Sequence, residues 1–202
     1  MVTQTERTAA AREAIIAAAI AVLGSEGHRA LTNTRLQEVS GHSRGLVSYH
    51  FGSRQGLLEA VIGSIRDDFL TDLVQPPDGE SMSGVRATVQ LIDTYLRELR
   101  RDPRRNLATL ALTVASLREL PQLQQAIREL NDDLRAGVRD LLTRGIEDRT
   151  VRPDADTTAA AGVVIAMLRG ATIQWLADPD AFDIDTARQE LSTVITRSYG
   201  SG

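Results

Sequence analysis

A run of polar side chains between residues 43 and 50 carries the groups that recognise a nucleic acid. Arg44 can donate hydrogen bonds to a guanine edge or to a phosphate. The hydroxyl and imidazole groups of the run can donate to phosphate oxygens, and they belong to Ser43, Ser48, Tyr49 and His50. If Arg44 opens a helix, the free amides of that N-terminus are further phosphate donors. These residue types predict contact with nucleic acid, provided that one helix presents them together.

Two short helices joined by a tight turn are expected to present this run. Thr32 is a good N-cap for the first helix, which should bury Leu36 and Val39. Gly41 can take the backbone angles that a tight turn needs, and Ser43 can cap the second helix. With one helix before it, this pattern is typical of a helix-turn-helix, whose second helix reaches base edges in the major groove.

Charge and composition narrow the class of partner. The first 58 residues hold six arginines and four glutamates, a net charge of +2, whereas the remainder holds 17 arginines and 23 carboxylates, a net charge of −6. A mildly basic segment on an acidic remainder fits a docking face for a polyanion, with chance asymmetry as the alternative. Aromatic residues make up 3% of the chain, which disfavours a reader of single strands or RNA, because such readers need stacking platforms.

Enzymatic chemistry finds little support in the sequence. The chain has no Cys and no Lys, which excludes a thiolate zinc site, a Cys nucleophile, a Walker-type phosphate loop and a Schiff-base lysine. His42 and His50 are eight residues apart, whereas zinc ligands on a helix recur roughly every four residues. No Gly-x-Ser-x-Gly elbow is present. We therefore expect no catalysis, no metal and no cofactor.

The residues around the turn resemble a known family. The stretch from Gly45 to Leu58 reads Gly-Leu-Val-Ser-Tyr-His-Phe-Gly-Ser-Arg-Gln-Gly-Leu-Leu and resembles the signature of the TetR family of transcriptional regulators. Upstream, Ser-Gly-His-Ser-Arg-Gly over residues 40–45 is similar to the family's Ala-Gly-Val-Ser-x-Gly turn. Gly27 and Thr32 stand at the family's Gly after the first helix and Thr that starts the second. The close resemblance covers residues 12–62.

Three positions depart from the family pattern. Ser48 stands where the family has the first aromatic residue of a pair, so that phosphate contact would be shorter or absent. Arg54 replaces the usual lysine, which keeps the charge and allows a forked contact with a phosphate. His42 replaces an apolar residue of the turn and is expected to be partly exposed.

The resemblance implies a role for each matching residue. Contacts with the DNA backbone are assigned to Thr32, Ser48, Tyr49, His50 and Arg54. Contacts with bases are assigned to Arg44, Gly45 and Leu46, and possible flanking contacts to Thr34 and Arg35. Packing is the alternative for Tyr49 and a solvated surface charge is the alternative for Arg35. Val47 and Phe51 are expected to pack in the core.

The rest of the chain is expected to be helical. Further helices are expected over residues 6–25, 54–74, 85–101, 106–117, 121–148, 157–177 and 186–198, with a loop rich in Pro, Gly and Ser over residues 75–84. The prediction is an all-α protein of about nine helices. A helix-turn-helix DNA-binding domain would span residues 1–52, followed by a larger ligand-binding and dimerisation domain over 53–202. The helix over about 54–74 would connect the two.

Two helices near the C-terminus indicate a homodimer. Residues 159–168 are apolar around the whole helix, which must therefore be covered on all sides. In the resembled family the last two helices form a four-helix bundle with the partner copy, and burial within one chain is the alternative. The candidate interface residues are Ala160, Val164, Leu168, Leu191, Val194 and Ile195. Two reading heads would then lie ~34 Å apart on a near-palindromic site of double-stranded DNA.

The resemblance also implies a cavity for a small-molecule effector. The candidate lining residues are Tyr95, Leu110, Thr113, Met167, Thr172 and Trp175, with ordinary core packing as the alternative for each. The expected function is that of a repressor released from a palindromic operator when the effector displaces the helix that begins at Arg54. A helical protein-interaction module without DNA binding is the alternative.

Two features bear on the compartment. The longest apolar run, over residues 159–168, is too short to span a bilayer, so no membrane partner is expected. No basic segment followed by an apolar run and a cleavage site opens the chain. The expected location is therefore the cytoplasm.

Overall fold

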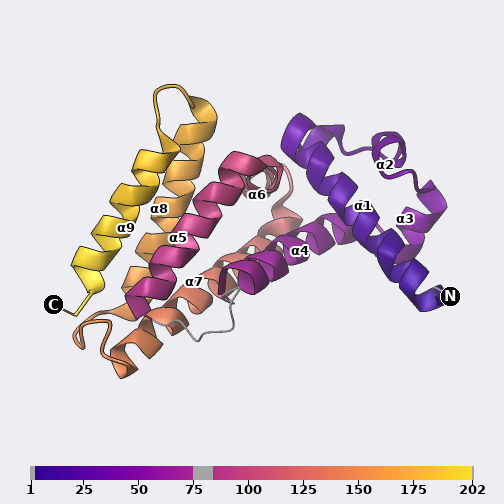
Figure 1. The fold of residues 1–202 in the computed structure, drawn as a ribbon. Helices are drawn as coiled ribbons and strands as arrows, with labels where there is room; N and C mark the ends of the chain where they lie inside the picture. The colour runs from indigo at the N-terminus through magenta and orange to yellow at the C-terminus, as the bar shows by residue number, and fades with distance from the viewer. Residues whose placement is uncertain (1–2, 75–83, 202) are drawn as a thin grey trace. The chain divides into compact units, whose positions relative to one another are not determined.

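The computed structural model describes residues 3–74 and 84–201. The helices, drawn in Figure 1, are α1 (Gln4–Glu26), α2 (Asn33–Ser40), α3 (Arg44–Phe51), α4 (Arg54–Val74), α5 (Gly84–Arg101), α6 (Arg104–Ser116), α7 (Gln124–Glu147), α8 (Thr157–Ala177) and α9 (Ile184–Tyr199). Within the described residues, β-structure is limited to a single bridge between Val151 and Gly200. The predicted all-α class is therefore confirmed. The predicted loop lies outside the described residues, except for Gly84, which begins α5.

Short-range signals in the sequence determine most helix boundaries. Asp156 accepts from the amides of Thr158 and Ala159 and so caps α8, while the Asp183 side chain caps α9. Pro103 interrupts the chain between α5 and α6, as expected, because proline cannot continue a helix. Several boundaries differ from the prediction by a few residues; α6 and α9, for example, begin at Arg104 and Ile184 rather than at residues 106 and 186. The start of α7 differs most. Pro121 opens a short 3-10 turn, η2 (Pro121–Leu123), and α7 begins only at Gln124.

The chain divides into two compact units. The first comprises Met1–Ile65 and Pro103–Leu130, and the second comprises Arg66–Asp102 and Asn131–Gly202. The boundaries of these units fall within α4 and α7. The expected boundary at residue 52 separates a DNA-binding domain from a ligand-binding domain by function. Contacts between helices do not test that boundary, so it stays a prediction.

The first unit is built around the pairing of α1 with α6. Ile15 and Ala19 of α1 and Leu112 of α6 are completely buried. The two backbones come close at Gly24, where an added Cβ atom would lie 2.4 Å from the carbonyl oxygen of Arg104. Only hydrogen fits between the helices at that point. The shorter helices α2 and α3 pack against the other parts of α1.

The second unit contains α5, α8 and α9 packed side by side (Figure 1). Its interior is aliphatic, with Leu91, Val164 and Ile195 completely buried. Charged pairs lie along the contact between α5 and α9, where Asp93 accepts from Arg188 and Arg100 donates to Asp185. Burial of apolar surface supplies most of the stability of such a bundle, and these partly exposed pairs contribute little.

Within the described ranges, two helices have the length and mean hydropathy of a membrane span, over residues 6–26 and 157–177. The second extends well beyond the ten-residue run identified in the sequence. Both helices also bury one face within a helical unit, as Ile15 does on α1 and Val164 on α8. The length and apolar composition of these two helices are therefore what packing in a protein core requires, and they do not by themselves indicate a membrane span.

The contact at Gly24 predicts a sharp steric effect. Gly24→Ala should lower the free energy of unfolding by about 1–3 kcal/mol, because the new methyl group collides with backbone that cannot rotate away. Thermal unfolding followed by circular dichroism measures the change.

Gly63→Ala is the matched control. An added Cβ atom at this glycine of α4 meets nothing within 4 Å, and alanine favours the helix by about 1 kcal/mol. Gly63→Ala should therefore stabilise the protein. Equal effects of the two substitutions would contradict the close approach of α1 and α6.

Candidate nucleic-acid interface

The turn between α2 and α3 is formed by local hydrogen bonds, as the sequence predicts. The Thr32 hydroxyl accepts from the Arg35 amide at 3.1 Å, and the Ser43 hydroxyl accepts from the Leu46 amide at 3.3 Å. Gly41 ends α2 in the left-handed region, with φ of 71°. Each capping hydroxyl keeps its own proton, so it can still donate to a phosphate at the start of its helix.

Helix α3 has a packed face and a solvent face. Val47 is buried, and the guanidinium of Arg12 on α1 lies 5.5 Å from the ring centroid of Phe51. Val47 is in the core as expected, whereas Phe51 is only half-buried. Arg44, Ser48 and Tyr49 are exposed, with Tyr49 at 76%. The Tyr49 ring touches only the edge of the His50 ring among the ring contacts of the described residues, and most of its surface is available to a partner. Its contact with the DNA backbone stays a prediction.

A hollow of about 470 Å³ lies beside α3 in the first unit. The N-termini of α2 and α4 contribute to its wall through Thr32, Asn33 and Ser53. Three arginines also line it, namely Arg29, Arg44 and Arg54; the remaining lining residues are Leu31, Leu36, Val47, Ser48, Gly52 and Leu57. Arg29 is paired with Glu119, but two helix N-termini beside Arg44 and Arg54 still favour an anion such as a phosphate.

Arg54 joins the start of α4 to the segment before α2. Its Nη2 donates to the carbonyl oxygen of His28 at 2.6 Å, and its Nε approaches that of Leu31 at 3.4 Å. The residue lines the hollow as well. Arg54 therefore has a structural contact in addition to its predicted contact with the DNA backbone.

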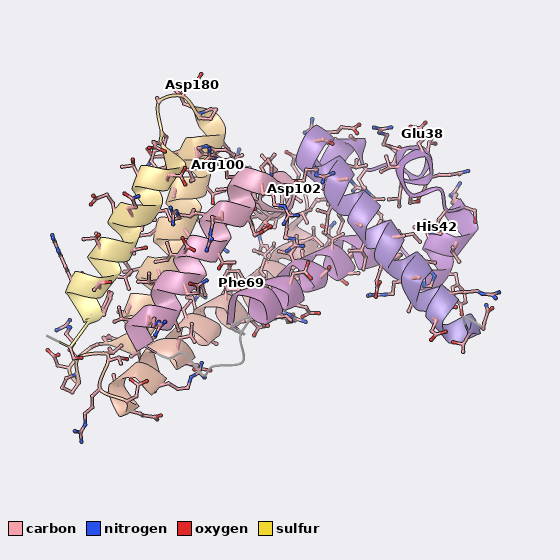
Figure 2. The ribbon with its side chains drawn as sticks, viewed as in Figure 1. Glu38, His42, Phe69, Arg100, Asp102 and Asp180 are labelled. Atoms are coloured by element: carbon pink, nitrogen blue, oxygen red, sulfur yellow. The ribbon has the colours of Figure 1, made fainter. Side chains whose placement is uncertain are left out.

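Two residues of α2 differ from what the sequence indicated. The Arg35 guanidinium forms ion pairs with Glu26 and Glu38, and these carboxylates raise the pKa of Arg35. This pairing favours a structural role over a flanking DNA contact. Val39 was expected to be buried but is 40% exposed, because α2 buries only Leu36. Figure 2 labels Glu38 on α2 and His42 in the following turn, where His42 is half-buried as expected.

The ring of His50 packs against its neighbours in α3. Its Nε2 atom is buried without a hydrogen-bond partner among the described residues, and its ring lies against those of Tyr49 and Phe51. Packing is therefore a further role for His50, and its phosphate contact stays a prediction. The other predicted contact residues, Thr34, Gly45 and Leu46, lie at the surface of α2 and α3, with Leu46 half-buried.

An ion-pair cluster joins the region behind the hollow to the end of α6. Glu119 accepts from Nε and Nη2 of Arg29, and the Nε2 atom of His28 lies 2.9 Å from the same carboxylate. Arg29 first, and then His28, lower the pKa of Glu119. Because Arg54 holds the carbonyl of His28, this cluster and the hollow share one segment of backbone.

The candidate effector-binding residues are only partly brought together. Within the second unit, Tyr95 on α5 forms a 3.2 Å hydrogen bond with Thr172 on α8, and Met167 and Trp175 are half-buried on α8. Leu110 and Thr113 are half-buried on α6, in the first unit. The effector site therefore stays a prediction.

Most of the candidate dimer residues lie in the core of their own chain. Four are at most 2% exposed, namely Ala160, Val164, Leu168 and Ile195. They cannot reach a partner without opening the second unit, so these four assignments are corrected. Leu191 is half-buried, and only Val194 is well exposed, at 45%. The sequence could not separate the two apolar sides of α8.

Three lining residues of the hollow were missed from the sequence. Asn33 and Ser53 adjoin Thr32 and Arg54 in the chain, so their positions at helix starts were the available signal, whereas Arg29 lies in the turn before α2 and has no such signal. Among the described residues, no group of three His, Asp or Glu side chains is arranged to hold a metal ion.

Two family models together match most of the chain. The model of bacterial regulatory proteins of the TetR family matches residues 15–61. The model of the C-terminal domain of BetI-type transcriptional repressors matches residues 85–199. No curated protein matches the chain.

Solved structures with this fold come from several bacteria. A TetR-family regulator from Rhodococcus sp. has a TM-score of 0.81 at 24% identity, covering 93% of this chain and 97% of its own. TylP, a TetR regulator from Streptomyces fradiae, has a TM-score of 0.77 at 25% identity, covering 96% and 89% respectively. FadR from Bacillus subtilis, solved with stearoyl-CoA, has a TM-score of 0.77 at 15% identity, covering 91% and 97%.

The Glu119 cluster predicts a pH-dependent contribution to stability. A carboxylate with a lowered folded-state pKa stabilises the protein above its ordinary pKa of 4.5, and this contribution is lost as the pH falls through the lowered value. Glu119→Gln should therefore lower the thermal midpoint at pH 7, and the gap from wild type should close on acidification below 4.5.

Glu147→Gln is the control for this measurement. Glu147 is an exposed carboxylate on α7 with no ion pair among the described residues. Its substitution should leave the midpoint almost unchanged at both pH values. A Glu119→Gln gap that persists in acid would show that the carboxylate charge is not the cause.

Proposed function

Because the chain belongs to the TetR family of bacterial transcriptional regulators, we propose that it is a repressor that binds a near-palindromic operator as a homodimer. A small molecule bound in the second unit releases it. The observation that carries this proposal is the exposed face of α3 beside a hollow lined by three arginines. Family membership disfavours the alternative of an interaction module without DNA binding.

The exposed face of α3 is proposed to enter the major groove. Arg44 is at the N-terminal end of α3, where recognition helices contact base edges, and its long side chain can fork onto a guanine. Gly45 allows the backbone to approach the bases closely. Tyr49, one turn further on, can donate its phenolic proton to a phosphate.

The hollow is proposed to hold a phosphate of the DNA backbone. Thr32 and Ser53 supply hydroxyl donors at the starts of α2 and α4, and Arg54 supplies a guanidinium whose Nη1 has no partner among the described residues. Phosphate contacts of this kind fix the register of the reading helix and carry no sequence information themselves. Ser48 also lines the hollow, so a short hydroxyl contact can replace the aromatic contact of relatives.

Substitutions at Arg44 and Arg54 should separate base reading from backbone binding. Arg44→Ala should weaken binding to the preferred site by about 1–3 kcal/mol and relax specificity at one base pair. Arg54→Ala should weaken binding to all sequences and reduce the salt slope by about one. Sites selected from random DNA, followed by titrations at several salt concentrations, measure both effects.

Two further variants test the assignment. Arg128→Ala removes an exposed arginine of α7 that does not line the hollow and should leave the affinity unchanged. Arg54→Lys keeps the charge and should recover part of the backbone affinity. If Arg44→Ala and Arg54→Ala both bound like wild type, the proposed reading head would be wrong.

The dimer contact is proposed to use the outward side of α8. Val163 and Ile173 are 47% and 51% exposed, which is high for large apolar side chains. Ala159, Ala166 and Ala177 are exposed on the same helix. Spacings of three and four residues place these positions on one face of α8. The small side chains of the three alanines allow the helix of a second copy to approach closely. Val194 of α9 adds an exposed apolar side chain to this surface.

A charge on this surface should produce monomers. Val163→Asp places a carboxylate in the proposed contact while leaving the buried side of α8 intact, so the protein should fold but sediment as a monomer at micromolar concentration. Val114→Asp, at an exposed valine of α6, is the control and should remain dimeric. A monomeric wild type would rule out the proposed dimer.

The proposed release acts through α4. This helix carries Arg54 at its first residue and Phe69 near its end, where the Phe69 ring lies edge-on to Tyr95 at 6.3 Å (Figure 2 labels Phe69). An effector that favours a displaced α4 would change the spacing of the two reading heads and lower the operator affinity.

A further inference from the structure

The second unit holds a half-buried cation that lacks a counter-ion. Arg169 is on α8, and its Nη2 donates to the side-chain oxygen of Asn131 on α7. Among the described residues, no carboxylate lies within 4.0 Å of its guanidinium. The pKa of the Arg169 guanidinium is lowered, and the largest cause is its burial away from water. A charge withdrawn from water without a partner of opposite sign costs stability, so its presence requires an explanation.

Neighbouring carboxylates already pair with other arginines. Asp132 accepts from Arg135 at 2.5 Å, and Asp133 lies 3.5 Å from Arg66. Arg135 is also near enough to Arg169 to disfavour its charged form. These two carboxylates are therefore engaged by other arginines, and among the described residues none is left to pair with the Arg169 guanidinium.

The polar groups next to Arg169 are hydroxyls in a short chain of hydrogen bonds. Thr172 donates to the carbonyl oxygen of Leu168 at 2.8 Å, so its only hydroxyl proton is used. In the 3.2 Å contact between Tyr95 and Thr172, the phenol must then be the donor. Both protons serve contacts within the chain. The guanidinium of Arg169 is the group in this cluster with N–H donors to spare.

An aromatic wall adjoins this cluster. The Phe69 ring of α4 stands at 69° to the ring of Tyr95, and Tyr95 in turn interacts with Arg169. A ligand that matches these features has an apolar body for the rings and one anionic group for the guanidinium. A cationic ligand would be repelled by Arg169 and Arg135.

We propose that Arg169 binds the carboxylate of an organic acid, so that the effector is an apolar molecule with a single carboxylate group. The proposal rests on the proposed function in one respect, which is that a small molecule controls the protein. A bidentate carboxylate would supply the missing counter-ion, and Asn131 would hold the guanidinium in place for it. The contact of Phe69 with Tyr95 then places the ligand next to the helix that begins at Arg54.

Matched ligand pairs test the carboxylate directly. Octanoate and benzoate are compared with octanol and benzyl alcohol, which keep the apolar body and lack the charge. Binding to the full-length protein is measured by calorimetry and by the fluorescence of Trp175, the single tryptophan. At least one carboxylate should bind wild type about tenfold more tightly than its alcohol. If neither carboxylate is preferred, the proposal is overturned.

Variants assign the preference to Arg169. In Arg169→Met the carboxylate should lose its advantage, whereas Arg169→Lys should keep part of it. Arg139→Met is the control, because that arginine of α7 is exposed and paired with Asp140. An unchanged preference in Arg169→Met would also overturn the proposal.

Stability without ligand provides a test that needs no ligand at all. If Arg169 is retained for a ligand, Arg169→Met should unfold at the same temperature as wild type or higher, because methionine fills the space without a desolvated charge. A lower unfolding temperature would mark Arg169 as a structural residue and overturn the proposal.

Operator release separates this proposal from the proposed function. If the carboxylate binds through Arg169 but leaves the DNA complex intact, the ligand site at Arg169 is supported and the proposed release of DNA by a ligand is contradicted. If DNA binding behaves as proposed while Arg169→Met binds the carboxylate like wild type, the reading head stands and the effector site fails.

Discussion

The guanidinium of Arg54 donates to the carbonyl oxygen of His28 and approaches that of Leu31, and the hollow proposed to hold a phosphate is built around this contact. It ties the start of α4 to the short segment between α1 and α2. The N-termini of α2 and α4 thereby line the same hollow, so their amide dipoles reinforce each other. The same backbone segment carries Arg29, which pairs with Glu119 at the end of α6.

Local structure could be predicted from the sequence because its causes are local. A hydroxyl side chain before a helix and a glycine after it act over three or four residues, so the caps at Thr32 and Ser43 and the turn at Gly41 follow from residue type. The exposed face of α3, with Arg44 and Tyr49, follows from helical periodicity in the same way. The family resemblance supplied the likeness to a DNA-binding head, and the family models agree with it.

Long-range packing could not be predicted, because it depends on which elements meet. Nothing near Val39 in the chain reveals that its side of α2 faces solvent, and nothing near Arg35 reveals the carboxylate of Glu26. Helix α8 is the clearest case. Its sequence is apolar on every side, so Val164 and Val163 are equivalent on composition, yet one is completely buried and the other half exposed. Arg169 is a further case, because only the surrounding helices show that its guanidinium has no carboxylate partner among the described residues.

The contact between Gly24 and the backbone of Arg104 has a mechanical consequence. Most helix pairs touch through side chains, which can change rotamer and absorb small shifts between the helices. Here backbone meets backbone, and bond geometry offers no comparable compliance. If α6 slides or tilts at this point, α1 has to move with it, because there is no flexible side chain between the two helices. A contact between two backbones therefore passes a displacement of one helix to the other without reducing its size.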